Sequence, residues 1–153
     1  MSKATRQVSI NNHVLMQEIT RMFSEMGKES ITFVVRGYSM RPFLEDRRDK
    51  VILVPPRTPR KGDVVLARTA KERYALHRVI AVTDGIYTMQ GDGNPLYMKE
   101  NFTEADIIGI ARAFIRKGKV VETTSRTWRW YSTAWRVLKP FRRVLLGIYR
   151  RAH

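Results

Sequence analysis

The sequence contains no cysteine, which excludes disulfide frameworks, thiol catalysis and metal sites with cysteine ligands. It has only three histidines, and because His13 and His153 lack a ligand-spaced partner, we expect no metal site and no cofactor. It also lacks an apolar run of about 18 residues, the length that a membrane-spanning helix requires. The first residues are polar and lack the apolar core of a secretory signal. These absences together favour a metal-free cytoplasmic protein.

Acidic residues are scarce: 14 Asp and Glu stand against 29 Lys and Arg, giving a net charge of +15 over 153 residues. About half of this excess lies from Arg126 to His153, where eight bases occur without an acid. The hydrophobic fraction of 43% is high enough for a packed core, so the chain is not a disordered basic polypeptide. We therefore expect a single domain over residues 1–125 and a basic, aromatic, helical extension over residues 126–153.

Hydrophobic periodicity predicts a β body with a helix at each end. Apolar residues recur every three or four positions from Val14 to Met26, which predicts an amphipathic helix capped by Asn11 or Asn12 and ended by Gly27. Between the helices, short β-branched and aromatic runs separated by turn residues predict about seven strands. These runs are residues 31–35, 50–54, 64–67, 74–82, 86–90, 107–115 and 120–123. The predicted fold class is mainly β (α+β), with a coiled antiparallel sheet.

The segment from Arg126 to His153 interleaves aromatic residues with its bases. The helical period returns at about Thr127 and is interrupted at Pro140. Three interpretations stay open. In the first, the aromatic stripe lies at an anionic membrane surface, which would make the protein peripheral to a membrane. In the second, the stripe packs on the β body. In the third, the cationic face binds nucleic acid or an acidic peptide.

The motifs that carry chemistry begin with Gly37-Tyr38-Ser39-Met40-Arg41-Pro42. Further elements follow in order, and they are Asp49-Lys50-Val51, Gly62-Asp63-Val64-Val65, the strand with His77-Arg78-Val79, and Gly91-Asp92-Gly93-Asn94. Together they resemble the signal peptidase I and LexA-like serine peptidases. A histidine rather than a lysine on the fourth element resembles the Ser–His version of that superfamily, and the resemblance implies its coiled β fold and peptidase activity.

The chemistry of Ser39 and His77 is coherent without the resemblance. A serine hydroxyl is a poor nucleophile until a base takes its proton, and an imidazole titrates close enough to neutral pH to do so. We therefore predict that Ser39 attacks a scissile carbonyl and that His77 acts as general base. The resulting oxyanion needs hydrogen-bond donors, such as the Ser39 backbone N–H.

The remaining site residues follow from the resemblance. It implies that Gly37 and Met40 line the oxyanion site and substrate cleft, with Gly37 standing where many relatives have a serine that helps to bind the oxyanion. Asp92 is the first candidate to orient His77, and Glu100 is the reserve. Structural roles remain as alternatives: Met40 as a core residue and Asp92 as part of the loop geometry.

Three functions remain in view. The first is a Ser–His endopeptidase of the signal-peptidase-like class, which acts on a specific peptide or protein precursor. The second is a LexA-like protein that cleaves itself, although a single helix before Ile31 is too little for a DNA-binding helix-turn-helix and the base is not lysine. The third is a non-catalytic binding module on the same scaffold, which uses its tail to hold a membrane or nucleic acid.

Overall fold

The computed structural model describes residues 13–152, so the predicted caps Asn11 and Asn12 lie outside the described residues. The helices are α1 (His13–Ser24), α2 (Arg126–Val137) and α3 (Arg142–Ala152), with short 3-10 turns at Glu104–Asp106 and Lys139–Phe141. The strands are β1 (Ile31–Val34), β2 (Lys50–Val54), β3 (Val64–Arg68), β4 (Tyr74–Thr83), β5 (Ile86–Gln90), β6 (Glu100–Phe102), β7 (Ile107–Arg116) and β8 (Lys119–Glu122).

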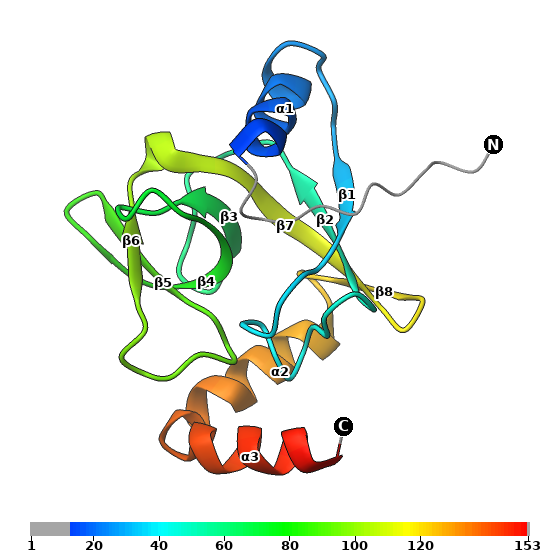
Figure 1. Cartoon of the computed structure of the whole chain (residues 1–153), viewed down its shortest axis with the longest axis vertical. Coiled ribbons are helices and arrows are strands. Elements are labelled where there is room, and N and C mark those ends of the chain that lie inside the picture. The colour runs from blue at the N-terminus through cyan, green and yellow to red at the C-terminus, as the bar shows by residue number, and fades with distance from the viewer. Residues whose placement is uncertain (1–12, 153) are drawn as a thin grey trace.

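The strands form one antiparallel sheet in the order β1-β2-β7-β3-β4-β5-β6, with β8 paired to β7. The sheet curls into a half-barrel (Figure 1). β3 and β7 occupy the middle of the sheet, and both are buried on both faces because each is a nearly continuous apolar run. Successive side chains of a strand point to opposite faces, so the sheet separates two apolar clusters.

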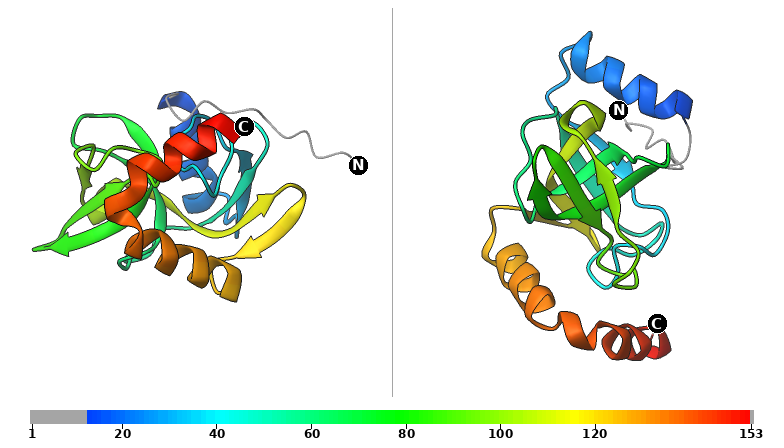
Figure 2. Two further views of the ribbon diagram at one scale, coloured as in Figure 1. Left: turned by 90° about the horizontal axis from the view of Figure 1, so that it is seen from below. Right: turned by 90° about the vertical axis from the view of Figure 1, so that its left-hand side faces the viewer.

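The helices close the curled sheet from opposite ends: Figure 1 and the right-hand panel of Figure 2 both show α1 at one end and α2 and α3 at the other. α1 buries Met16, Ile19 and Phe23, the residues of its apolar stripe. α2 begins after Ser125, whose side chain accepts a hydrogen bond from the Trp128 N–H, and it inserts Trp128 into the same cluster that α1 covers.

The mainly β class and the antiparallel, curled sheet are therefore confirmed, as is a helix at each end of the β body. Every predicted strand is present. The sequence prediction missed β6, which has only three residues and is too short to show an alternating pattern. The C-terminal segment forms two helices separated at Lys139–Phe141, where Pro140 interrupts the hydrogen-bonding pattern of α2.

Candidate active site

Ser39 lies in the loop between β1 and β2, which spans residues 35–49. The loop is closed at its base, because the Val35 N–H donates to the Asp49 carbonyl at 2.8 Å and the Arg47 N–H donates to the Val35 carbonyl at 2.8 Å. Nearer to Ser39, the Gly37 N–H donates to Asp46 Oδ1 at 2.7 Å. Among the described residues, neither the hydroxyl nor the amide of Ser39 has a hydrogen-bond partner, so both are available to a bound substrate.

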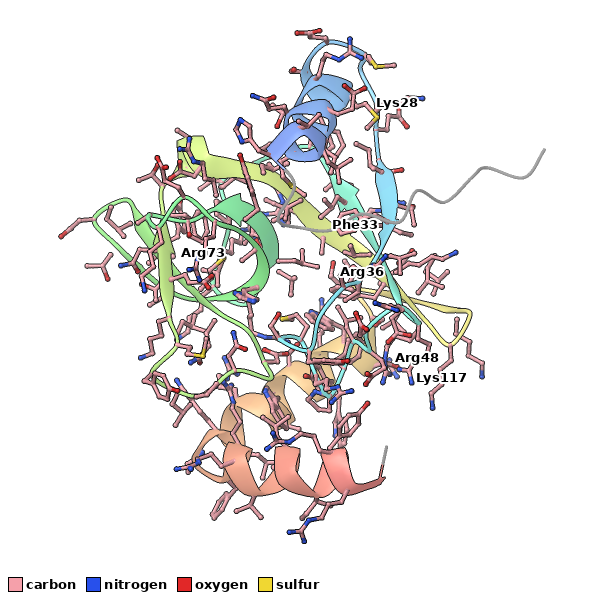
Figure 3. All side chains as sticks on the ribbon, viewed as in Figure 1. Lys28, Phe33, Arg36, Arg48, Arg73 and Lys117 are labelled. Carbon is pink, nitrogen blue, oxygen red and sulfur yellow. The ribbon has the colours of Figure 1, made fainter. Side chains whose placement is uncertain are left out.

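Asp49, the acid that follows the serine motif, holds the serine loop in place through hydrogen bonds. Its side chain is fully buried and accepts hydrogen bonds from the Glu45 N–H at 2.8 Å, the Lys117 N–H at 3.2 Å and the Arg48 guanidinium at 2.9 Å. Figure 3 shows Arg48 and Lys117 on the same side of the molecule, near the β8 turn. Burial opposes ionisation of this carboxyl, but the hydrogen bonds outweigh it and lower the pKa of Asp49. Asp49 therefore ties the serine loop to the β7–β8 hairpin.

His77 is a buried residue of β4 that faces a carboxylate. Its Nδ1 lies 3.0 Å from Glu100 Oε2, and the ring is 5% exposed. Glu100 belongs to β6, where it pairs with Met89 of β5, which pairs in turn with Val79 of β4. Because Val79 and His77 are two residues apart, they lie on the same face of the sheet, and the carboxylate reaches the imidazole across that face.

Ser39 is brought toward His77 by Gly91. Arg78 pairs with Gln90, the last residue of β5, so Gly91 directly follows β5 at the level of His77 in the neighbouring strand. A Cβ atom at Gly91 would lie 3.0 Å from Ser39 Cβ and 2.4 Å from the Ser39 carbonyl oxygen. Gly91 therefore brings Ser39 to the part of the sheet that carries His77.

The contact with Gly91 therefore places the Ser39 hydroxyl on the side of β5 where the His77 strand lies. In the described part of the chain, no hydrogen bond joins Ser39 to His77, which is common in substrate-free sites, where catalytic contacts tighten only around the substrate. The close approach of the Ser39 loop also explains why residue 91 is a glycine: Ser39 occupies the space that a side chain at this position would need. The neighbouring Gly93 has the same function, since a Cβ there would lie 2.6 Å from the Tyr38 carbonyl oxygen.

The other Gly-Asp element supports β4 from outside. The Gly62 N–H donates to the Val79 carbonyl at 2.8 Å, and the Val79 N–H donates to the Asp63 carbonyl at 2.8 Å. Asp63 Oδ2 also accepts from the Arg60 N–H at 2.8 Å, which makes Asp63 a turn-forming residue. These bonds fix β4 two residues beyond His77.

Asp92 does not orient His77, and that prediction is wrong. Both carboxylate oxygens of Asp92 are bound by the Arg78 guanidinium, at 2.9 and 2.8 Å, and the Tyr131 hydroxyl donates to Oδ2 at 2.9 Å. Arg78 follows His77 in β4 and so points to the opposite face. Burial, together with the nearby Asp92 charge, raises the pKa of Tyr131 well above its usual value, which keeps this hydroxyl a donor. The carboxylate at His77 is the reserve candidate, Glu100.

The structure contradicts the prediction for Met40, which is 2% exposed and belongs to the apolar core, so it does not line an open cleft. Gly37 is exposed, and its backbone N–H donates to Asp46 Oδ1. Its φ of +85° shows that the glycine allows a left-handed turn before the serine, and its place at the oxyanion site stays a prediction.

The C-terminal helices brace the serine loop. The Tyr149 hydroxyl of α3 donates to Glu45 Oε2 at 2.9 Å, and Arg41 donates to the same carboxylate at 2.6 Å. Burial opposes ionisation of Glu45, but these hydrogen bonds outweigh it and lower the pKa of its carboxyl. In α2, Trp128 and Trp135 are buried, which favours packing on the β body for the first part of the aromatic stripe.

Over residues 13–152, no group of three acidic or histidine side chains is placed to hold a metal ion. Over the same range, every helix is too short or too polar to cross a bilayer. No protein-family model matches the chain, and neither does any curated protein.

The sequence interpretation could not choose Glu100 over Asp92. In the sequence, Glu100 is visible only as an acid a few positions beyond the glycine loop, in a three-residue strand that is too short to show a pattern. The register of β4, β5 and β6 is what brings the Glu100 carboxylate to the His77 imidazole.

Proposed function

We propose that the protein is a serine endopeptidase of the signal-peptidase-like class, with Ser39 as nucleophile, His77 as general base and Glu100 as the residue that positions the base. The observation that carries the proposal is the His77–Glu100 pair, 3.0 Å apart, on the face of the sheet where Gly91 admits Ser39. The ordered motifs of the superfamily resemblance add support, because each of them has a contact at or beside this site.

In this proposal, the His77–Glu100 contact supports one assignment of the protons. A carboxylate opposite Nδ1 favours the tautomer that carries a proton on Nδ1, so Nε2 has the free lone pair. Nε2 accepts the Ser39 hydroxyl proton as the oxygen attacks the scissile carbonyl, and it then delivers that proton to the leaving amine. The Ser39 amide supplies one donor for the tetrahedral oxyanion. Water hydrolyses the acyl-enzyme by the same route in reverse.

The experiment is turnover of a proteome-derived peptide library, read as new N-termini by mass spectrometry. Wild-type protein should produce termini that share a local sequence, and Ser39→Ala and His77→Ala should produce none. The same termini from wild type and Ser39→Ala would overturn the proposal. A time-dependent mass change of the purified protein itself, blocked by Ser39→Ala, would instead indicate self-cleavage.

Glu100→Gln tests the positioning role. The variant keeps the shape of the side chain but removes the charge, so kcat should fall by about 10²- to 10⁴-fold with little change in KM. Glu100→Asp should recover part of the rate, which a merely structural role would not predict. Asp92→Asn is the comparison variant, and it should keep kcat closer to the wild-type value than Glu100→Gln does. The assignment of Glu100 would be wrong if Glu100→Gln were fully active and Asp92→Asn lost 10²-fold or more in kcat.

A peripheral place at an anionic membrane is the second part of the proposal. Three apolar side chains at the end of the chain are 60–63% exposed: Phe141 of the Lys139–Phe141 turn, and Val144 and Ile148 of α3. The aromatic residues Trp128 and Trp135 of α2 are buried instead. Arg143 lies between Phe141 and Val144 in sequence, and Arg150 follows Ile148; both arginines are exposed, so this segment presents apolar and cationic side chains to solvent. Co-sedimentation with phosphatidylglycerol vesicles should weaken in Phe141→Ser/Ile148→Ser, and equal sedimentation of wild type and variant would refute this placement.

A further inference from the structure

A basic pocket lies on the face of β4 opposite His77, between the β body and α2. Its volume is about 610 Å³, in the range typical of small-molecule sites. Neither Ser39 nor His77 lines it. Eight Lys and Arg residues do, together with only two acids, Asp63 and Asp92.

Both acids are already neutralised. Asp92 is held by Arg78 at 2.8 Å, and Asp63 is held by Arg57 at 3.0 Å. The six remaining cations have no carboxylate within salt-bridge distance in the part of the chain that the structure describes. They are Arg60, Lys61, Arg129, Arg136, Lys139 and Arg142.

Arg142 is the strongest sign that the pocket is suited to an anion. It is 6% exposed, yet the groups that it contacts directly are uncharged: Nη1 donates to Gln90 Oε1 at 3.1 Å and to the Asn94 carbonyl at 3.4 Å, and the guanidinium lies over the Trp135 ring. Its Nε is buried and has no hydrogen-bond partner. A buried guanidinium without a counter-ion is costly, and a buried donor without an acceptor adds to that cost.

The charges around Arg142 repel one another. Burial lowers the pKa of Lys139, and the nearby charges of Lys99, Arg142 and Lys61 lower it further. Burial also lowers the pKa of Arg142, because Asp92 only partly compensates. A multiply charged anion would relieve both effects. Guanidinium groups match the geometry of phosphate oxygens in particular, and the Thr133 hydroxyl adds a neutral donor to the lining.

We propose that the basic pocket binds a phosphate ester with at least two negative charges, with its phosphate against Arg142 and Lys139. Such a group belongs either to a soluble phosphorylated molecule or to a phosphomonoester lipid headgroup. The proposal does not depend on peptidase activity, because the pocket lies across the sheet from Ser39 and His77.

The test uses inorganic pyrophosphate as the soluble probe, in calorimetry at fixed ionic strength, and vesicles with and without phosphatidic acid as the lipid probe. Arg136→Gln/Lys139→Gln removes two charges that line the pocket. Lys71→Gln/Lys119→Gln removes two exposed charges that belong neither to the pocket nor to the exposed surface of α3. The pocket variant should bind at least 10-fold more weakly than wild type, and the control variant should bind within about 2-fold of wild type.

Arg142→Met provides a second variant whose folding can be checked independently. Replacing an unpaired buried charge by an apolar group of similar length should leave the thermal midpoint unchanged or higher, while binding falls at least 10-fold. Ser39→Ala should bind as wild type does.

Both sources of phosphate support the proposal when the pocket variants alone lose binding. Pocket-dependent binding of pyrophosphate identifies a soluble ligand, and pocket-dependent binding confined to phosphatidic acid vesicles identifies a headgroup. Absence of binding to either probe would overturn the proposal. Equal losses in the two double variants would overturn it too, since they would show only general attraction to a basic surface.

Discussion

Gly91→Ala should impair the proposed peptidase activity more than it destabilises the fold. The added Cβ would stand 2.4 Å from the Ser39 carbonyl oxygen, about 1 Å inside the ordinary contact distance of 3.4 Å. Because the obstructing atom is backbone, no side-chain rotation relieves the contact, and the serine loop must move. Overpacking of this kind typically costs about 1–3 kcal/mol of stability. A displacement of about 1 Å at a nucleophile costs on the order of 10²-fold in rate.

The assay pairs urea denaturation with turnover of the peptide that wild type cleaves fastest. Gly147→Ala is the matched control, because a Cβ there meets nothing within 4 Å and alanine is the better helix former in α3; it should gain about 0.5–1 kcal/mol and keep full activity. A Gly91→Ala protein with wild-type stability would refute the close packing of the two loops. A destabilised variant with wild-type turnover would refute the placement of Ser39 against Gly91 as the basis of catalysis.

Two further predictions concern stability. Asp92→Ala should cost about 3–5 kcal/mol in urea denaturation, because it leaves the Arg78 guanidinium, whose side chain is 11% exposed, without a carboxylate partner among the described residues. Adding Arg78→Met should recover part of the loss, and a cost below about 1 kcal/mol would contradict the pairing. The lowered pKa of Asp49 means that its ionised form stabilises the fold fully above the ordinary carboxyl value of 3.8 and that this contribution is lost as the pH falls through the lower pKa of the folded state. The stability difference between wild type and Asp49→Asn should therefore shrink below about pH 4, and a difference that is constant with pH would show that the carboxylate charge contributes nothing.

Local sequence determined most of the fold. The three- and four-residue spacing of apolar side chains is sufficient for α1, and β-branched runs between turn residues are sufficient for the strands, because both patterns depend on which side of a single element is buried. The turn at Asp63 is also local, because the Asp63 side chain accepts from the Arg60 N–H three residues earlier. Pro140 likewise fixes the break between α2 and α3 from within the chain.

The partners of His77 and Arg78 were decided only by the tertiary structure. These two residues are adjacent in β4, so alternation sends them to opposite faces, where one meets Glu100 and the other meets Asp92. Both acids were visible in the sequence, but the choice between them depends on the register of three strands and on β6, whose three residues carry no pattern. The burial of Arg142 was also decided by the tertiary structure. Nothing in the local sequence of α3 indicates that this arginine is buried and bonded to the neutral Gln90 side chain, because its burial results from the packing of α2 and α3 on the β body.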